Sequence, residues 1–276
     1  MPTCTIRDIP VHYEIHGEGR PLLTIHGWGV DHRLMKGCME PFFDAHPGPW
    51  RRIYFDLPGM GRTPGQPWIT GSDAMLEVVT GFIDEILHGE RFALAGESYG
   101  GYLSRGLVAK MAERIDGLFL LCPLADPDTR LDNAPPLKVL ERDPALLERL
   151  SPADREAFCF VAVRQTEDCW ALYRENVLPG LQCMDQAFLE TYLGQRVPFG
   201  FEIDSLEKPF AKPALILTGR QDSMVGYKDQ WAFLEAYPRA SFVVLDKAGH
   251  ALESEQVSLF QALFGDWLTR IQAETV

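Results

Sequence analysis

A serine set among glycines is the residue whose surroundings most clearly suggest chemistry in this sequence. Ser98 lies in the segment LAGESYGG, with Gly96 two residues before it and Gly100 two residues after it. The apolar run 92–95 before this segment predicts a buried strand, and the apolar spacing over 103–111 after it predicts a helix. Because glycine leaves room between closely packed backbones, we expect a sharp turn from strand to helix with Ser98 at its apex.

This turn gives Ser98 surroundings that suit nucleophilic attack. It lifts the hydroxyl above the edge of the sheet and places it beside the N-terminus of the following helix. A helix N-terminus carries partial positive charge and favours negative charge nearby. Attack of a serine on a carbonyl carbon creates an oxyanion, so the position suits a nucleophile.

A serine hydroxyl is a weak nucleophile, and it needs a base that is oriented by an acid. The segment LILTGRQD places Asp222 just beyond the penultimate predicted strand, and VVLDKAGH places His250 just beyond the last one. In open α/β sheets, functional groups gather outside the carboxyl ends of the strands. Ser98, Asp222 and His250 are therefore expected at one edge of the sheet.

The elements that must position these residues alternate between strands and helices. Such alternation indicates βαβ units and a mostly parallel sheet in an α/β protein. Residues 5–19 predict a two-strand hairpin, and 72–89 predict an amphipathic helix with Ser72 or Asp73 as its N-cap and Gly89 past its end. The C-terminal segment 254–271 predicts another helix. Further strands are expected in 21–27, 50–55, 91–96, 115–123, 212–219 and 240–245.

The alternation stops between Leu124 and Pro209, where helical patterns occur without strand runs like those elsewhere. Ser151 is the expected N-cap of one helix and Pro152 its first residue. Helical patterns also cover 168–177 and 185–195. We therefore expect residues 1–123 and 210–276 to form one core α/β domain. Residues 124–209 are expected to form an inserted helical cap over the edge of the sheet.

Composition and charge limit the classes of partner. The chain has 276 residues, of which 46% are hydrophobic and 24% charged, and its formal net charge is −13. These values are ordinary for a globular protein with a sizeable core. Strong negative charge argues against nucleic acid and anionic membrane surfaces as partners, because both attract basic patches. A small-molecule substrate is the expected partner, and the sequence carries no signal for oligomeric state.

Neither a secretion signal nor a membrane span is expected from the sequence. The first residues lack a basic region followed by an apolar stretch, and no apolar run approaches ~18 residues. We therefore expect a cytoplasmic protein. The six cysteines are scattered without a C-x-x-C pair, which predicts free thiols. His12 and His16 lie in a strand-like alternation without further ligands nearby, so we expect no metal site.

Five motifs together give the sequence a clear resemblance to the α/β-hydrolase superfamily. The resemblance covers nearly the whole chain. It rests on HGWG at 26–29, DLPGMGRT at 56–63, GESYGG at 96–101, GRQD at 219–222 and AGH at 248–250.

The resemblance implies a role for each residue of the site. Ser98 would be the nucleophile, His250 the base and Asp222 the acid. The backbone N–H groups of Trp28 and Tyr99 would form the oxyanion hole. Neither a cofactor nor a metal would be needed. Some members of the superfamily draw the acid from an earlier strand end, so Asp126 is the alternative to Asp222.

We expect the other polar residues near these motifs to have structural roles or to be exposed. His26 is expected to hold the oxyanion loop through hydrogen bonds. The side chain of Glu97 is expected to point away from the Ser98 hydroxyl. Met60 and Thr63 stand where the superfamily often has histidine and serine, and we interpret their loop as structural. His32, His46 and His88 are expected to be exposed.

The expected activity is a carboxylesterase reaction on a small or medium apolar ester through an acyl-enzyme. Since an unperturbed imidazole has a pKa of ~6.5, activity should fall below that pH as His250 takes up a proton. Aromatic residues of the predicted cap are available to line an apolar pocket: Phe158, Phe160, Trp170, Tyr173, Phe188, Tyr192, Phe199 and Phe201.

Three other functions fit the same motifs. A C–C bond hydrolase acting on a vinylogous keto acid would need basic side chains, for which Arg105, Arg164, Arg174 and Arg196 are available. An aminopeptidase similar to proline iminopeptidases would need cap carboxylates, for which Glu156, Glu167 and Glu175 are available. Outside the enzymes, a small-molecule receptor with the same fold is the remaining alternative.

Overall fold

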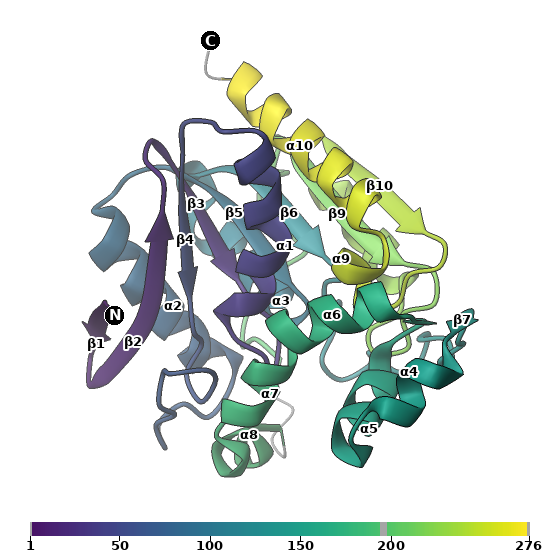
Figure 1. Cartoon of the computed structure of the whole chain (residues 1–276). Helices are drawn as coiled ribbons and strands as arrows, with labels where there is room; N and C mark the ends of the chain where they lie inside the picture. Colours follow the sequence, from purple (N-terminus) through teal and green to yellow (C-terminus); the bar gives the residue numbers. More distant parts are fainter. Residues whose placement is uncertain (1, 194–197, 275–276) are drawn as a thin grey trace.

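The computed structural model describes residues 2–274 apart from 194–197, and a single large sheet lies at its centre (Figure 1). Its strands follow the spatial order β1-β2-β4-β3-β5-β6-β9-β10. In chain order they are β1 (Thr3–Ile6), β2 (Ile9–His16), β3 (Arg20–Ile25), β4 (Trp50–Phe55), β5 (Phe92–Glu97), β6 (Ile115–Leu121), β9 (Ala214–Gly219) and β10 (Ala240–Leu245).

All strands from β4 to β10 in this order pair in parallel, whereas β1 and β2 are antiparallel to their neighbours. The hairpin expected in 5–19 is therefore confirmed, as is the mostly parallel sheet. Parallel pairing brings the carboxyl ends of β5, β9 and β10 to the same edge. The three residues singled out for chemistry follow these strand ends.

Helices cover both faces of the sheet (Figure 1). One face packs against α1 (His32–Ala45) and α10 (Val257–Ala273). The other packs against α2 (Ser72–Leu87), α3 (Tyr99–Met111) and the 3₁₀ segment η2 (Asp229–Ala236). Alternate residues of each strand enter the two cores. In β5, for example, Leu94 faces the α2/α3 core while Ala95 faces the α1/α10 core.

Between β6 and β9 the chain leaves the sheet and forms a helical segment, residues 124–209, which we call the insertion. Figure 1 shows its helices below the carboxyl edge of the sheet. A parallel pair of two-residue strands, β7 (Glu141–Arg142) and β8 (Arg164–Gln165), also occurs there. The helices are α4 (Pro144–Arg149), α5 (Pro152–Val161), α6 (Glu167–Asn176), α7 (Leu178–Cys183) and α8 (Gln186–Leu193).

Helix ends in the structure differ from two of the sequence-based expectations. Helix α2 has Gly71 as its N-cap rather than Ser72 or Asp73. The hydroxyl of Ser72 lies 3.2 Å from the Tyr99 hydroxyl, so it is turned towards the core instead of capping the helix. The expected N-cap Ser151 is confirmed, because its hydroxyl accepts a hydrogen bond from the N–H of Asp154.

The C-terminal helix expected over 254–271 is divided at Gln256, where φ is −134°. A short helix, α9 (Leu252–Glu255), precedes α10. The Glu255 carboxylate accepts hydrogen bonds from the N–H groups of Val163, Arg164 and Gly249. These contacts tie α9 to the insertion and to the loop that carries His250.

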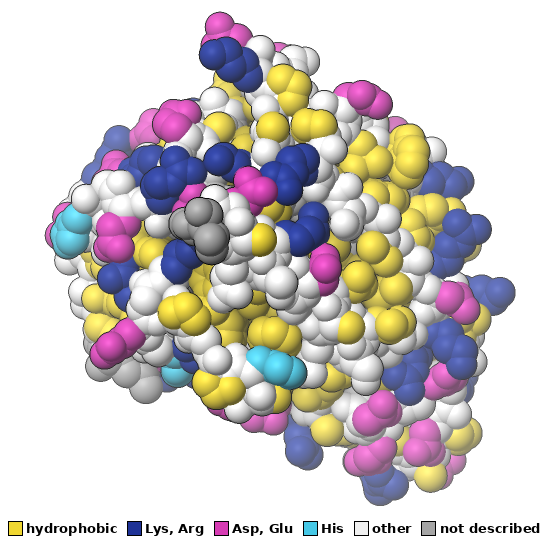
Figure 2. All heavy atoms as spheres, turned by 90° about the horizontal axis from the view of Figure 1, so that it is seen from above, with side chains coloured by type: hydrophobic (Ala, Val, Ile, Leu, Met, Phe, Trp, Pro, Cys, Tyr) yellow, Lys and Arg dark blue, Asp and Glu magenta, His cyan; other side chains and the backbone are white. Residues whose placement is uncertain are grey.

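The surface opposite the insertion mixes charges of both signs. Seen from that side, Lys and Arg side chains lie among Asp and Glu side chains (Figure 2). Among the residues with an assigned structure, no helix combines the length and hydrophobicity required of a membrane span. All six cysteines are free thiols, as expected.

Candidate active site

The turn at Ser98 has the tight geometry that the sequence predicts. Ser98 has φ 51° and ψ −115°, a conformation that L-residues rarely adopt and that costs roughly 1–3 kcal/mol. A Cβ on Gly96 would collide with the Ser104 hydroxyl, and one on Gly100 would collide with the carbonyl oxygen of Ile25. Glycine at both positions therefore allows β5, the turn and α3 to pack this closely.

Ser98, His250 and Asp222 form a continuous line of hydrogen bonds. The Ser98 Oγ lies 3.0 Å from His250 Nε2, and Asp222 Oδ2 lies 2.9 Å from His250 Nδ1. With its proton on Nδ1, the ring donates to the carboxylate and can accept the serine proton on Nε2. The structure thus brings together the three residues that the sequence places at separate strand ends.

Asp222, and not Asp126, is the carboxylate that contacts the histidine. Asp222 is fully buried, and its second oxygen accepts hydrogen bonds from the N–H groups of Met224 and Val225. These bonds hold the carboxylate in one orientation. Asp126 is exposed, and its side chain accepts a hydrogen bond from the N–H of Asp128 instead.

The loop containing Trp28 is fixed by His26, as expected. The ring of His26 accepts a 2.9 Å hydrogen bond from the N–H of Leu57 on Nε2, while its Nδ1 lies 2.7 Å from the carbonyl oxygen of Gly27. The Trp28 ring packs edge-on against the Tyr99 ring, with centroids 5.3 Å apart. The two residues expected to supply oxyanion donors are therefore neighbours.

The DLPGMGRT loop has the structural role that we expected. Its first residue, Asp56, accepts hydrogen bonds from the backbone of His32 and Arg62. The Met60 sulfur accepts from the N–H of Gly29, and the Thr63 hydroxyl accepts from that of His12. The residues that depart from the usual superfamily pattern thus hold β2 and the Trp28 loop in place.

The expectation that His32 is exposed was wrong. His32 is buried, and its Nδ1 lies 2.7 Å from Asp56 Oδ1 while its Nε2 lies 3.2 Å from Glu14 Oε1. Burial lowers the pKa of His32, but the carboxylates of Asp56, Asp31 and Glu14 outweigh this effect and raise it. Burial also raises the pKa of Asp56, yet the contact with His32 brings it to about 2. His46 and His88 are exposed, as expected.

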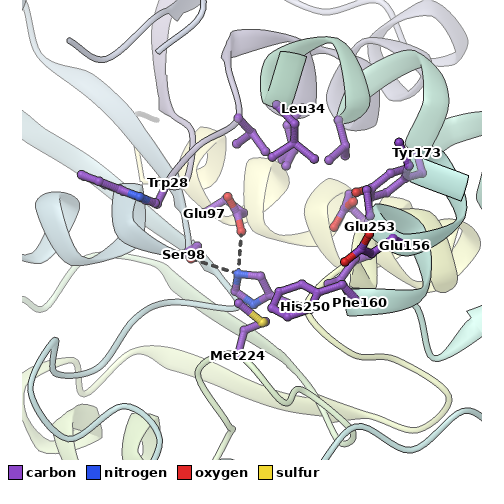
Figure 3. A pocket seen from close by; sticks show the side chains of 17 residues that line it. Trp28, Leu34, Glu97, Ser98, Glu156, Phe160, Tyr173, Met224, His250 and Glu253 are labelled. Carbon is purple, nitrogen blue, oxygen red and sulfur yellow. Dashed lines mark hydrogen bonds and ion pairs between the residues drawn. The ribbon is translucent and has the colours of Figure 1, made fainter. Parts of the chain in front are cut away.

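The side chain of Glu97 does not point away from the site, contrary to expectation. Its Oε1 lies 3.3 Å from His250 Nε2, the same nitrogen that faces the Ser98 hydroxyl. Figure 3 shows Glu97 and Ser98 on the same side of the histidine ring. The turn at Ser98 directs both side chains into the cavity, which the alternation of a regular strand would not do.

Glu253 is a second buried carboxylate in this cavity, and the sequence analysis missed it. It lies on α9, three residues after His250, and is 7% exposed. Its nearness to the histidine in sequence was the available signal. A short helix after a loop, however, gives no periodicity from which the direction of a side chain can be read.

His250 and the two buried glutamates of the cavity have shifted pKa values. Burial lowers the pKa of His250, but the charge and hydrogen bond of Asp222, together with the charges of Glu97 and Glu253, raise it to about 9. Burial raises the pKa of Glu97 to about 7. Burial and the charge of Glu97 raise that of Glu253 to about 8. An unperturbed imidazole was therefore the wrong reference for His250.

Ser98 and His250 open into a cavity of about 510 Å³ (Figure 3). Much of its wall is aliphatic and comes from both the core and the insertion. These side chains are Val30, Leu34, Val161, Val177, Leu181 and Met224.

The aromatic residues of the insertion divide between the cavity and the packing behind it. Phe160 and Tyr173 line the cavity. Phe158 and Trp170 are buried beside Tyr173, with the Phe158 ring 5.3 Å from each of the other two ring centroids. The Tyr192 hydroxyl lies 2.6 Å from the Tyr99 hydroxyl. The remaining members contact the core: Phe188 against Gly59, Phe199 stacked on Tyr102, and Phe201 beneath the Lys110 ammonium.

The arginines considered for an anionic substrate are absent from the described lining of the cavity. Arg105 is buried and paired with Asp204, and Arg164 pairs with Glu141. Arg174 is exposed, and Arg196 lies outside the described residues, as do positions 194 and 195 of the helix expected over 185–195.

The three glutamates considered for binding the amine of an aminopeptidase substrate do not lie together. Only Glu156 of the three lines the cavity. Glu167 pairs with Arg149 on the surface, and Glu175 is exposed.

Besides a group that includes Asp222 and His250 of the site, two groups of described residues have ligand atoms close enough together for a metal ion, namely Asp31, His32 and Asp56, and His12, Glu14 and His32. Those of His12, Glu14 and His32 lie within 4.8 Å of one another. The Glu14 carboxylate is bonded to Lys36 and His16, at 2.8 Å and 3.1 Å. His16 therefore contacts Glu14 instead of adding a ligand to this group.

Sequence comparisons identify the family. A family model described as "alpha/beta hydrolase fold" matches residues 20–253. Pimeloyl-[acyl-carrier protein] methyl ester esterase of Legionella pneumophila (strain Paris) is 24% identical over 267 residues, covering 94% of this chain and 99% of the relative. The 2-hydroxy-6-oxononadienedioate/2-hydroxy-6-oxononatrienedioate hydrolase of Paraburkholderia phymatum is 25% identical over 284 residues, covering 95% and 91%.

Solved structures show the same architecture. An alpha/beta superfamily hydrolase from Oenococcus oeni PSU-1 superposes with a TM-score of 0.85 at 29% identity, covering 95% of this chain and 96% of that one. A thermophilic esterase from Thermogutta terrifontis, at 23% identity and a TM-score of 0.69, shares the fold over 98% of this chain and 97% of its own. The chain therefore belongs to the α/β-hydrolase fold family and is a hydrolase.

Proposed function

We propose that this hydrolase is a carboxylesterase that cleaves a small or medium ester through an acyl-enzyme on Ser98. The observation that carries the proposal is the line from Asp222 through His250 to the Ser98 hydroxyl, with separations of 2.9 and 3.0 Å. This line ends in a cavity of about 510 Å³ with a largely aliphatic wall. An ester with an apolar part suits such a cavity.

In the proposed mechanism, Ser98 attacks the ester carbonyl while His250 Nε2 takes the hydroxyl proton. Asp222 stabilises the resulting imidazolium. The N–H groups of Trp28 and Tyr99 stabilise the oxyanion, and one such donor is worth roughly 3–4 kcal/mol. His250 then protonates the leaving alcohol, and water activated by the same nitrogen hydrolyses the acyl-enzyme. The N–H of Tyr99 suits this role because the first N–H groups of a helix have no intrahelical partner.

We also propose that residues 124–209 act as a cap on a core formed by 1–123 and 210–276. Support comes from the cavity wall, to which the insertion contributes Phe160 of α5, Tyr173 of α6 and Leu181 of α7. A layer of helices above Ser98 would keep bulk water from the acyl-enzyme and contact the substrate.

The relatives suggest two reactions, and the charges in the cavity favour one of them. The Paraburkholderia relative is named for a dicarboxylate substrate. A dicarboxylate here would meet Glu97, Glu156 and Glu253, while neither Lys nor Arg occurs among the described residues of the wall. The Legionella relative is named as a methyl ester esterase. An ester group carries no charge, so esterase activity is the better-supported choice.

The nucleophile can be tested by covalent labelling. A fluorophosphonate should add one label to the wild-type protein, on Ser98, and abolish hydrolysis of 4-nitrophenyl butanoate. Ser98→Ala should prevent both labelling and turnover. Ser258→Ala, which changes an exposed serine of α10, is the matched control and should behave as wild type. Equal labelling of Ser98→Ala would refute the assignment.

The acid can be tested by comparing two substitutions. Asp222→Asn should lower kcat by up to ~10⁴, because the amide neither holds the required histidine tautomer nor stabilises the imidazolium. Asp126→Asn should leave kcat close to wild type, since this exposed side chain contacts Asp128. Steady-state kinetics on one activated ester decide between them. A larger loss in Asp126→Asn would assign the acid to the earlier strand end.

The pH dependence of kcat/KM should reflect the pKa of His250 and the charge of its neighbour Glu97. Only neutral His250 accepts the serine proton, so kcat/KM should rise with pH until it passes the histidine pKa of about 9. Glu97→Gln removes a negative charge that raises this pKa, so the acid limb should move to lower pH by roughly one unit or more. If the acid limb of kcat/KM does not move in Glu97→Gln, Glu97 is not ionised in that pH range.

The cap can be tested with two neighbouring phenylalanines. Phe160 lines the cavity and is 65% exposed, so Phe160→Ala should change relative kcat/KM across acyl lengths by ~1–3 kcal/mol with little change in Tm. Phe158 is buried, so Phe158→Ala should lower the free energy of unfolding by about 3–5 kcal/mol. If Phe160→Ala lowers stability and keeps the wild-type preference for acyl length, the insertion stabilises the fold and does not select the substrate.

A further inference from the structure

One side chain of the insertion contacts both residues that are proposed to supply the oxyanion donors. The Tyr192 hydroxyl lies 2.6 Å from the Tyr99 hydroxyl, and the Tyr192 ring packs against the Trp28 ring with the centroids 5.0 Å apart. Tyr192 belongs to α8 and is buried. It is absent from the described wall of the cavity, so its connection to the site runs through Trp28 and Tyr99.

The backbone around Trp28 depends on contacts from outside its own loop. Trp28 is flanked by two glycines, and the second of them, Gly29, has φ of 78°. Because glycine allows many backbone conformations, such a segment takes its position from its neighbours. The Gly29 N–H donates to the Met60 sulfur, and the Trp28 ring lies edge-on to Tyr99 and tilted by 37° against Tyr192. The position of the Trp28 N–H therefore depends partly on the two tyrosine rings.

Helix α8, which carries Tyr192, is itself held on the core. The N–H of Asp185, just before this helix, donates a 2.8 Å hydrogen bond to the carbonyl oxygen of Gly59. The Phe188 ring packs so closely on Gly59 that a Cβ there would collide with it. Phe188 lies one helical turn before Tyr192, and the two ring centroids are 6.1 Å apart. The DLPGMGRT loop thus fixes α8, and α8 holds Tyr192 against Trp28.

The Tyr99 side chain is held by a buried chain of hydroxyl groups. Its hydroxyl lies between those of Tyr192, at 2.6 Å, and Ser72, at 3.2 Å. Burial raises the pKa of Tyr192 to about 12 and that of Tyr99 well above its ordinary value. Both tyrosines therefore stay protonated over the pH range of enzyme assays. The chain fixes the first residue of α3, whose N–H is the second proposed oxyanion donor.

We propose that Tyr192 is a positioning residue that fixes the N–H groups of Trp28 and Tyr99 relative to each other, so that the insertion helps to build the oxyanion hole. The inference rests on the proposed esterase activity and gives the insertion a part in the chemical step. The oxyanion exists only after Ser98 has attacked, whereas substrate binds before it forms. Loss of the Tyr192 hydroxyl should therefore lower kcat and kcat/KM equally and leave KM nearly unchanged.

The kinetic test uses Tyr192→Phe, which removes the hydroxyl and keeps the ring. Its kcat for ethyl butanoate should fall about tenfold, less than the roughly 10²–10³ lost when an oxyanion donor is removed outright. The loss should be the same at every pH, because the hydroxyl does not titrate in the assay range. Circular dichroism and Tm show whether the variant is folded. A rise in KM at unchanged kcat would contradict the proposal.

Two further variants separate positioning from simple attachment of the insertion. The Tyr102 hydroxyl also joins α3 to the insertion, because it accepts a 2.9 Å hydrogen bond from the N–H of Phe199. Tyr102→Phe is therefore the matched control and should keep the wild-type kcat. Tyr99→Phe removes the other half of the hydroxyl pair, so adding Tyr192→Phe to it should cause no further loss. If Tyr102→Phe loses as much kcat as Tyr192→Phe, the hydroxyl only attaches the insertion.

A trifluoromethyl ketone tests the oxyanion hole without turnover. When Ser98 Oγ bonds to the carbonyl carbon of 1,1,1-trifluoroheptan-2-one, the carbonyl oxygen becomes the oxyanion and the hydroxyl proton passes to His250. Binding is followed by fluorine NMR, beside the matching alcohol 1,1,1-trifluoroheptan-2-ol, which cannot form this adduct. In Tyr192→Phe the Kd of the ketone should rise about tenfold while that of the alcohol stays unchanged.

The same titrations distinguish failure of this proposal from failure of the esterase proposal. The adduct signal should appear in wild type and be absent in Ser98→Ala. If wild type forms no adduct, the esterase mechanism fails, and the role of Tyr192 fails with it. If wild type and Tyr192→Phe bind the ketone equally, or if ketone and alcohol weaken by the same factor, only the positioning role is overturned.

Discussion

The left-handed turn at Ser98 is the constraint on which the site depends. With φ at 51°, the backbone leaves β5 and enters α3 without an intervening loop. This conformation requires close contact between strand and helix, which Gly96 and Gly100 permit. It also places the Ser98 hydroxyl opposite His250 and the N–H of Tyr99 at the first position of α3. The proposed nucleophile and one proposed oxyanion donor are thus aligned by one backbone feature.

The carboxylates around His250 control when this residue is protonated. Asp222 orients the ring from one side, while Glu97 faces the nitrogen that takes the serine proton in the proposed mechanism. Two further negative charges therefore make the histidine a stronger base and also hold it protonated over a wider pH range.

The sequence predicted the features that follow from strand order and missed those that depend on local side-chain direction. Parallel strands bring their carboxyl ends together, so Ser98, Asp222 and His250 could be grouped without coordinates. The direction of Glu97 could not be read, because it lies where the strand becomes a turn. The burial of His32 could not be read either, because its partner Asp56 is distant in sequence. The aromatic residues of the insertion gave no sign of which ones face the cavity.

A crystal structure of the phosphonylated protein would show directly whether Ser98 is the nucleophile. We expect a covalent bond from Ser98 Oγ to phosphorus, with the phosphoryl oxygen about 2.7–3.1 Å from the backbone nitrogens of both Trp28 and Tyr99. His250 should remain hydrogen-bonded to Asp222 and face the adduct. A phosphoryl oxygen directed away from these two nitrogens would contradict the proposed oxyanion hole, and an adduct on another residue would contradict the role of Ser98.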